Sequence, residues 1–171
     1  MNRKFFLRDP RIVARDLLGV ELPRRMGSKT IHGMIVETEA YCGTQDKASH
    51  VYKGRTPRNE PMFGPPGTIY VYLVYGMHYC LNLVTGEPDV PGAVLIRGIR
   101  LMPNGHRIDG PGRLTRALSV TKSFNNKNIL TDKKLRLGRR IMTPKKIIRA
   151  PRVGVDYAEE WASKPLRFLL E

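Results

Sequence analysis

Two carboxylates, a histidine and several tyrosines lie within the stretch 35–82. In an extended strand side chains alternate between the two faces, so Glu37, Glu39 and Tyr41 share one side. The Cα atoms of Glu37 and Glu39 would then be about 7 Å apart, close enough for each carboxylate to perturb the other. Because two acids on a core-facing strand are unfavourable, we expect them to have a catalytic or ionic role.

A carboxylate can activate a water molecule if it is ionised, held near the electrophile and kept from bulk solvent. Glu37 and Glu39 are both candidates for this role. The alternative is that each carboxylate is a structural partner for an arginine, either Arg97 or the loop residues Arg55 and Arg58.

The aromatic and histidine side chains also have two interpretations. Tyr41, Tyr70, Tyr72 and Tyr75 could stack on a flat base, or they could pack on half-buried strands. His50 could donate a proton or form a pocket wall, although a lone histidine is more often a satisfied surface or core group. The functional interpretation rests on acids, rings, a histidine and a positive field occurring together.

The charge of the chain favours a polyanionic partner. The 171 residues include 30 Lys and Arg against 15 Asp and Glu, which gives a formal net charge of +15 and a pI near 10.3. Nucleic acid is the commonest polyanion that such a field attracts, although some basic proteins are merely soluble and positive. Arg139 and Arg140, with Lys145 and Lys146, could contact a phosphate backbone or lie in a solvated loop.

Cysteine, histidine and hydropathy patterns restrict the class of protein further. Cys42 and Cys80 form no CxxC pair and no signal sequence precedes them, so we expect a reduced, cytoplasmic compartment. The four histidines lack the spacing of metal ligands, so no metal site is expected. The apolar stretches are too short to span a membrane.

Periodicity and turn residues predict the elements that position these side chains. A helix is expected over 9–18, an antiparallel hairpin from strands at 20–24 and 31–41, and a long loop over 42–67. Further strands are expected over 68–84, interrupted at Gly76, and over 93–100, where Arg97 stands on a sheet face. The sequence Gly110-Pro111-Gly112 leads into a helix over 113–121, whose start could bind an anion or could be an ordinary proline-initiated turn. Over 153–170, strands around a turn or short helix at 157–161 are expected to close the chain.

Six motifs in one order carry a resemblance that covers nearly the whole chain. They are VETEAY (36–41), TPRN (56–59), PGTIYVYLVYGMHYCLN (66–82), GPGRL (110–114), RVGV (152–155) and KPLRF (164–168). The chain closely resembles the alkyladenine, or 3-methyladenine, DNA glycosylase family. The resemblance implies an α+β fold, with one compact domain over 1–171 around a curved, mostly antiparallel sheet with flanking helices. It also implies a monomeric, cytoplasmic and nucleoid-associated enzyme that removes alkylated or deaminated purines from double-stranded DNA without a cofactor.

The same resemblance implies roles for individual residues. Glu39 corresponds to the acid that activates the attacking water, Arg97 to the residue that helps hold that water, and Glu37 becomes supporting. Tyr75 corresponds to the wedge that fills the gap left by the flipped base. The residues that correspond to the base pocket and its purine screen are Tyr41, His50, Tyr72 and Asn82. With Tyr75, the expected DNA contacts are Arg58, Arg113, Arg139 and Arg140.

Two departures and two rival functions accompany this interpretation. Gly112 stands where some family members have serine, and His78 and Tyr79 replace other aromatics, which could shift substrate preference. One rival is a non-catalytic basic nucleic-acid-binding protein, which leaves Glu39 and Arg97 without a purpose. The other is a metal-dependent nuclease whose ligands would be Glu37, Glu39, Asp46 and His50.

Overall fold

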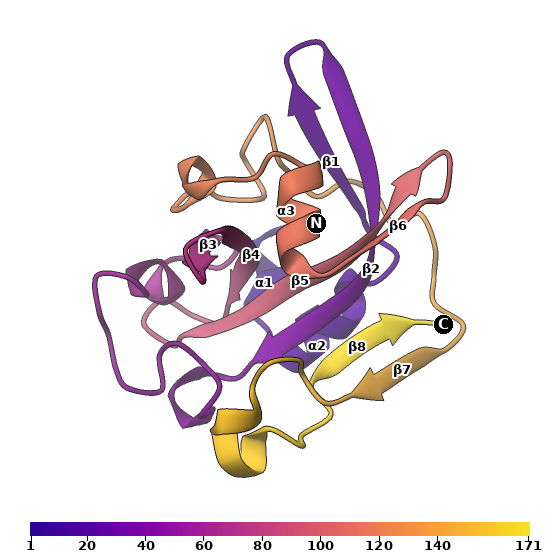
Figure 1. Cartoon of the computed structure of the whole chain (residues 1–171). Coiled ribbons are helices and arrows are strands. Elements are labelled where there is room, and N and C mark those ends of the chain that lie inside the picture. The colour runs from indigo at the N-terminus through magenta and orange to yellow at the C-terminus, as the bar shows by residue number, and fades with distance from the viewer.

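An open, eight-stranded antiparallel sheet organises the computed structural model, which describes residues 1–171 (Figure 1). Six strands follow the order β3-β4-β5-β2-β8-β7, while β1 pairs with β2 and β6 pairs with β5. The strands are β1 (Glu21–Met26), β2 (Lys29–Tyr41), β3 (Ile69–Val74), β4 (His78–Thr85), β5 (Gly92–Met102), β6 (Arg107–Asp109), β7 (Ile147–Ala150) and β8 (Arg167–Leu170). The α+β, mostly antiparallel fold expected from the sequence is confirmed.

Short helices flank this sheet. The α-helices are α1 (Arg3–Phe6), α2 (Pro10–Leu17) and α3 (Pro111–Ala117), and the 3-10 helices are η1 (Gly43–Gln45), η2 (Glu60–Phe63), η3 (Lys122–Phe124) and η4 (Asp156–Trp161). Figure 1 shows α2 behind the sheet and α3 in front of it. None of these helices has the length and apolar character needed to cross a membrane.

The side chains of β2 alternate between the hydrophobic core on one face of the sheet and the two carboxylates on the other. Thr38 donates its hydroxyl to the carbonyl of Ala14 in α2, at 2.8 Å, and Ala40 belongs to the main hydrophobic core. Glu37 and Glu39 therefore face the opposite side of the sheet, as the period-two pattern predicts. The register with β5 shifts on both sides of Glu37, so a bulge lies at the carboxylates. Bulges commonly re-aim side chains beside active sites.

The first long helix begins and ends as its sequence predicts. Asp9 accepts the backbone N–H of Arg11 at 2.8 Å, and Pro10 occupies the first turn, where its missing N–H costs nothing. Gly19 follows the helix with φ +80°, and a Cβ atom there would lie 2.0 Å from the carbonyl oxygen of Met142. Only glycine fits this position.

The C-terminal part differs from expectation. Strand structure was expected from residue 153, but β7 ends at Ala150 and residues 151–155 leave the sheet. The cause is two long-range contacts. The side chain of Arg152 binds Asp46, and the backbone N–H of Val153 donates to Glu39. This irregular segment therefore belongs to the candidate site.

Candidate active site

A pocket of about 340 Å³ opens between the β3–β4 hairpin, the end of β2 and the 153–157 segment. Glu39, Tyr41, His50, Tyr72, Asn82 and Arg97, expected from the sequence to form the site, all line it, together with Arg58 and Tyr75. Residues from β2, β3, β4 and β5 thus meet at one place although they span nearly 60 positions of the chain. The structure brings the expected catalytic and base-contacting residues together.

Glu39 is the buried acid of this pocket. Its side chain is fully buried, and its carboxylate accepts the hydroxyl of Tyr41 and the backbone N–H of Val153, each at 3.0 Å. Arg97 Nε lies 3.5 Å from Glu39 Oε1. Burial raises the pKa of Glu39 above its usual 4.5, and Arg97, the Val153 N–H and the Tyr41 hydroxyl offset part of that rise. The arrangement holds a partly desolvated carboxylate in one orientation.

Glu37 has a different environment two residues earlier. Arg97 Nε and the Arg167 guanidinium each donate to Glu37 Oε1 at 3.0 Å, and the Arg107 guanidinium lies 4.0 Å from Oε2. Glu37 is thus the centre of an arginine cluster. Arg97 donates its hydrogen bond to Glu37 while remaining near Glu39, so it links the two acids. The structural alternative considered for the carboxylates applies to Glu37.

Three rings form the wall of the pocket. His50 Nδ1 lies 2.9 Å from the Tyr70 hydroxyl, and the His50 and Tyr72 ring centroids are 4.3 Å apart. Part of the imidazole is exposed, yet the surrounding protein and then the charge of Arg58 lower the pKa of His50 to about 4. His50 is therefore neutral at physiological pH and can both donate and accept a hydrogen bond. Burial raises the pKa of Tyr72 well above 10, so this phenol stays protonated.

Asn82 is held rigidly in the pocket. Its amide nitrogen donates to the backbone carbonyls of Tyr70 at 3.2 Å and Cys80 at 3.4 Å, and the residue is buried. These two bonds fix the orientation of the amide. A group entering the pocket therefore meets a fixed polar side chain.

Exposed apolar side chains surround the mouth of the pocket. Tyr75 is 88% exposed at the tip of the β3–β4 hairpin, where φ is +50°, and Met77 and Tyr157 are each 69% exposed. Exposed rings and apolar tips around a pocket are typical of a binding surface. Met77 and Tyr157 were missed by the sequence interpretation. Their residue types alone do not distinguish them from core residues.

A buried ion pair anchors the back of the site and was also missed. Arg152 donates to both oxygens of Asp46, at 2.6 and 2.8 Å, and both side chains are fully buried. The Arg152 guanidinium also donates to the carbonyl of Ala40 and lies 4.7 Å from the centre of the Tyr41 ring. Because the next residue, Val153, donates to Glu39, the Asp46–Arg152 pair holds the segment that orients the acid. The RVGV motif is the sequence signal that could have indicated it.

The residues that the nuclease hypothesis would use as metal ligands have different partners in the structure. Glu37 binds arginines, Asp46 binds Arg152, and His50 faces Tyr70. No three His, Cys, Asp or Glu side chains come close enough together to hold a metal ion. The four residues therefore do not form a shared ligand set.

The expected DNA-contacting arginines divide into two groups. Arg58 lines the pocket and lies 5.8 Å from the Tyr72 ring, while Arg113 is exposed on α3, which begins at the pocket residue Pro111. Arg140 instead donates to the carbonyls of Asp16 and Leu18 at the end of α2, on the other side of the sheet. Arg58 thus lines the pocket and Arg113 lies on the helix that begins beside it, whereas Arg139 and Arg140 do not line the pocket.

Gly112, at the start of α3, has a packing explanation. A Cβ atom at this position would lie 2.9 Å from His78 Cγ. The glycine and the histidine, two departures from the family pattern, are therefore in direct contact. The absence of a side chain at Gly112 leaves room for the His78 ring.

Comparisons with known proteins agree with this geometry. The family model for methylpurine-DNA glycosylase (MPG) matches residues 4–171. A protein of Myxococcus xanthus is 47% identical over 98% of this chain and 88% of its own length, and one of Desulfitobacterium hafniense is 45% identical over 100% and 95%. A protein of Legionella pneumophila strain Corby is 42% identical over 100% and 94%. Each of the three bears the name "Putative 3-methyladenine DNA glycosylase". With the match extending over nearly every residue and several curated relatives above 40% identity, the chain belongs to the methylpurine-DNA glycosylase family.

Proposed function

We propose that this protein removes alkylated or deaminated purines from double-stranded DNA by hydrolysing the N-glycosidic bond, with Glu39 activating the attacking water. The observation that carries the proposal is the fully buried Glu39 carboxylate in a ring-lined pocket. Family membership supports the reaction class. The acid, the rings and the basic surface then have one common purpose.

The reaction requires the base to leave the duplex. A base inside the stack cannot present its glycosidic bond, and a damaged base costs less to extract than a normal one. The volume of about 340 Å³ suits a single flipped purine, with Tyr72 and His50 providing ring contacts. Tyr75, at the exposed hairpin tip, is placed to fill the vacated gap in the stack.

Hydrolysis then needs a base and a stabilised sugar. An alkylated purine is already a good leaving group, so an oxocarbenium-like sugar develops as the bond breaks. Glu39 accepts the proton of the attacking water and its negative charge stabilises the sugar. Arg97 supports this role because its charge favours the ionised form of Glu39 and offsets part of the pKa rise that burial causes. The product is a free base and an intact strand with an abasic site.

Asn82 is proposed to screen the flipped base. Its fixed amide would clash with the exocyclic amine of a normal guanine, while purines without that group fit. This screen restricts the reaction to selected purines.

The decisive experiment uses duplex oligonucleotides that carry one hypoxanthine, ethenoadenine or alkylated purine. Base release followed by hot-alkali cleavage should reveal an abasic site only in the damaged strand. Because no lysine lies in a motif suited to a Schiff base, borohydride should trap no covalent adduct. An adduct would contradict water as the nucleophile, and absence of release from every purine lesion would contradict the proposed function.

Base extrusion has its own test in Tyr75→Ala. A fluorescent base analogue beside the lesion reports extrusion, and loss of the ring should reduce extrusion and excision while affinity for undamaged duplex changes little. Extrusion and excision equal to the unmodified protein would mean that Tyr75 is not the wedge.

A further inference from the structure

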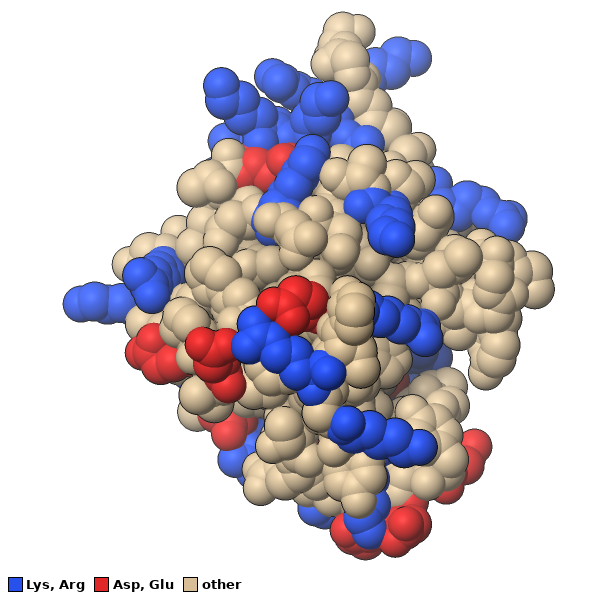
Figure 2. Space-filling model, turned by 90° about the vertical axis from the view of Figure 1, so that its left-hand side faces the viewer, with Lys and Arg blue, Asp and Glu red and all other residues tan.

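The positive charge of this protein is concentrated away from the pocket. Residues 24–29 and 122–136 contain eight Lys and Arg and a single acid, Asp132. That acid is already occupied, because it accepts the backbone N–H groups of Lys134 and Leu135 at 2.8 Å and lies 3.6 Å from Lys127. Figure 2 shows Lys and Arg gathered at the top of the molecule and acidic residues toward the left and the bottom. The excess charge at the top has no partner within the protein.

Backbone pairing explains how these cations share one surface. The segment 134–139 runs antiparallel to β1, with Arg25 N–H donating to the Lys134 carbonyl at 2.8 Å and a bridge between Arg24 and Leu135. Leu135 is buried, and Arg24 is buried with its Nε donating to the carbonyl of Leu118. Because neighbouring residues on a strand alternate faces, Arg25, Lys134 and Arg136 all point outward.

This outward arrangement is unfavourable without an external anion. Arg25 and Lys134 are opposite one another, and like charges directly across paired strands destabilise a sheet. Neither residue forms an ion pair, and Lys122, Lys133 and Arg136 are likewise exposed and unpaired. We name Arg25, Lys122, Lys133, Lys134 and Arg136 the basic face.

The surface chemistry of this region fits phosphates. Beside the basic face lies an open hollow of about 450 Å³ that contains no hydrophobic lining residue. Its lining residues are Lys127, Asn128, Thr131, Asp132, Lys133 and Lys134. A polar, cation-rich hollow suits a hydrated phosphate backbone, whereas protein interfaces are depleted in lysine.

The opposite flank of the pocket, near η4 and the 42–67 loop, differs from the basic face in how its cations are paired. Near η4, Lys47 pairs with Glu159 at 2.6 Å and with Glu160 at 2.9 Å, and Arg55 in the 42–67 loop pairs with Glu60 and Asp89. Lys47 and Arg55 are thus neutralised by the protein itself, whereas Lys53 and Arg58 of the same loop form no ion pair. The two flanks of the pocket therefore differ in what they offer to a polyanion.

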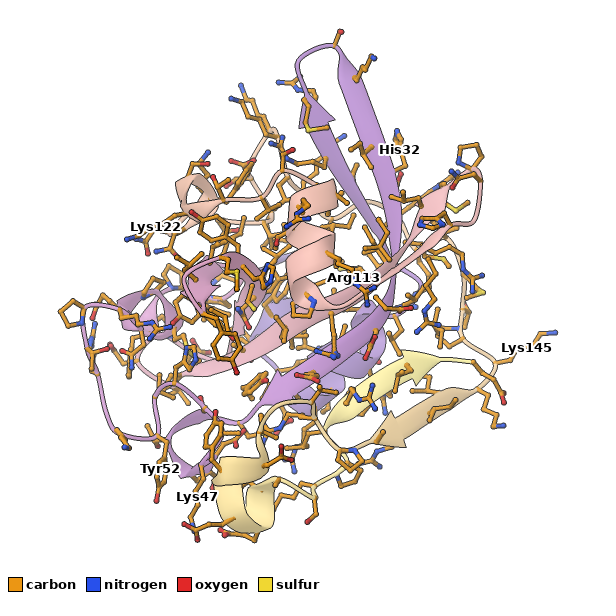
Figure 3. All side chains as sticks on the ribbon, in the orientation of Figure 1. His32, Lys47, Tyr52, Arg113, Lys122 and Lys145 are labelled. Atoms are coloured by element: carbon orange, nitrogen blue, oxygen red, sulfur yellow. The ribbon has the colours of Figure 1, made fainter.

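The length of β3 gives the scale of the separation between Tyr75 and the hollow beside the basic face. The N–H of Ile69, at the start of β3, donates to the Lys127 carbonyl, and Tyr75 follows the end of the same strand. Six strand residues span about 20 Å. At 3.4 Å per base pair this is about six base pairs. Figure 3 shows Lys122 pointing outward from the adjacent η3.

We propose that the basic face binds the phosphate backbone of the duplex on one side of the lesion only, about six base pairs away. This proposal rests on the proposed function for the placement of the lesion at the pocket. It assigns the two flanks of the DNA unequal roles. One flank is held by the basic face, and the other passes the 42–67 loop, where Lys47 and Arg55 are paired with acids.

The test compares two triple variants that remove equal charge. Arg25→Gln/Lys134→Gln/Arg136→Gln alters the basic face, and Arg3→Gln/Lys4→Gln/Lys145→Gln removes three exposed, unpaired cations elsewhere. Affinity for undamaged duplex is measured across a series of KCl concentrations. The basic-face variant should lose roughly tenfold or more in affinity and lower the salt slope by about 2.7, while the control keeps its slope. Equal losses in both variants, or none in the basic-face variant, would overturn the proposal.

Flank length gives a second readout. Duplexes with about twelve base pairs on only one side of a lesion analogue, and about four on the other, are prepared in both polarities. The unmodified protein should prefer one polarity, and the basic-face variant should lose that preference. Equal binding of both polarities by the unmodified protein would contradict one-sided contact. Because binding is measured without base release, failure of the proposed catalytic function would leave this result interpretable.

Discussion

Glu37 and Glu39 are the same residue type, two positions apart on one face of β2, but their partners differ. Glu37 is surrounded by the cationic side chains of Arg97, Arg107 and Arg167. Glu39 is fully buried, accepts one phenol and one backbone N–H, and has Arg97 as its nearby cation. The Glu37 carboxylate is occupied by hydrogen bonds and ion pairs to arginines, whereas Glu39 is held mainly by neutral donors and burial raises its pKa. The comparison indicates that partner type distinguishes Glu37, which is held by arginines, from Glu39, the proposed catalytic acid.

The largest expected effect is that of Glu39→Gln. The amide keeps the shape of the side chain but cannot accept a proton from water, so excision should fall by about 100-fold or more. Affinity for damaged duplex should be retained, because the pocket and the basic surface are unchanged. Single-turnover base release and equilibrium binding measure the two quantities. Nearly normal excision would remove Glu39 from the proposed catalytic role.

The second prediction concerns pH and the Asp46–Arg152 pair. Excision needs the Glu39 carboxylate, so the rate should fall as pH drops through the pKa of Glu39, which lies above 4.5. Asp46→Asn leaves Arg152 buried without a countercharge and loosens the Val153 N–H that stabilises ionised Glu39. The pKa of Glu39 should then rise further, the acid limb should move to higher pH, and excision near neutrality should fall about tenfold.

The controls for this prediction separate positioning from folding. Asp46→Asn should lower the free energy of unfolding by about 3 kcal/mol, so its circular dichroism spectrum must first show a folded protein. Arg152→Lys keeps the charge but not the two-pronged contact and should shift the acid limb in the same direction. A uniform loss of rate at every pH, with an unmoved limb, would mean that the pair acts on folding alone.

Ionisation of Glu39 should raise the rate of excision but lower the free energy of unfolding. Because its pKa is raised in the folded state, the protonated form of Glu39 is favoured by folding. Its contribution to stability is present below the unfolded pKa of 4.5 and is lost as pH rises through the raised folded pKa. At the pH at which Glu39 is ionised and can act as a base, the free energy of unfolding is therefore lower.

The third prediction is that Glu37→Gln ranks below Glu39→Gln in its effect on chemistry. Removal of the charge leaves three partly exposed arginines facing each other, so the free energy of unfolding should fall by about 2 kcal/mol. Excision should fall less than tenfold, through a displaced Arg97. Thermal unfolding and single-turnover rates measure both effects. A larger catalytic loss for Glu37→Gln than for Glu39→Gln would exchange the two roles.

The sequence was sufficient to predict the strand that carries these acids, but it did not predict which residues contact them. Period-two alternation placed Glu37, Glu39 and Tyr41 on one face, since that pattern depends only on local backbone geometry. Val153 and Arg167 contact the acids from more than 110 positions away, and no local pattern encodes such a pairing. The same limit explains why residues 153–155 were expected to be a strand.

The basic residues illustrate the same limit at the surface. Arg139 and Arg140 were expected at the DNA because of their charge, but the guanidinium of Arg140 binds the last carbonyls of α2. Charge density is visible in a sequence. Which cations remain free for a partner depends on where distant backbone carbonyls and carboxylates lie after folding.

The smallest expected effect is that of Tyr41→Phe, which removes one of the two neutral donors to Glu39. The Tyr41 hydroxyl donates to Glu39 Oε2 at 3.0 Å, and one such bond to a charged acceptor is worth about 1.5 kcal/mol or more. Excision near neutrality should fall only a few-fold, because the Val153 N–H and Arg97 still support the carboxylate. The acid limb of the rate profile should move slightly to higher pH, since an ionised Glu39 has lost a donor. His50→Gln serves as the matched control, because it alters the same pocket without touching Glu39 and should leave the limb in place. A limb that moves equally in both variants would show that pocket packing, and not donors to the carboxylate, sets the protonation of Glu39.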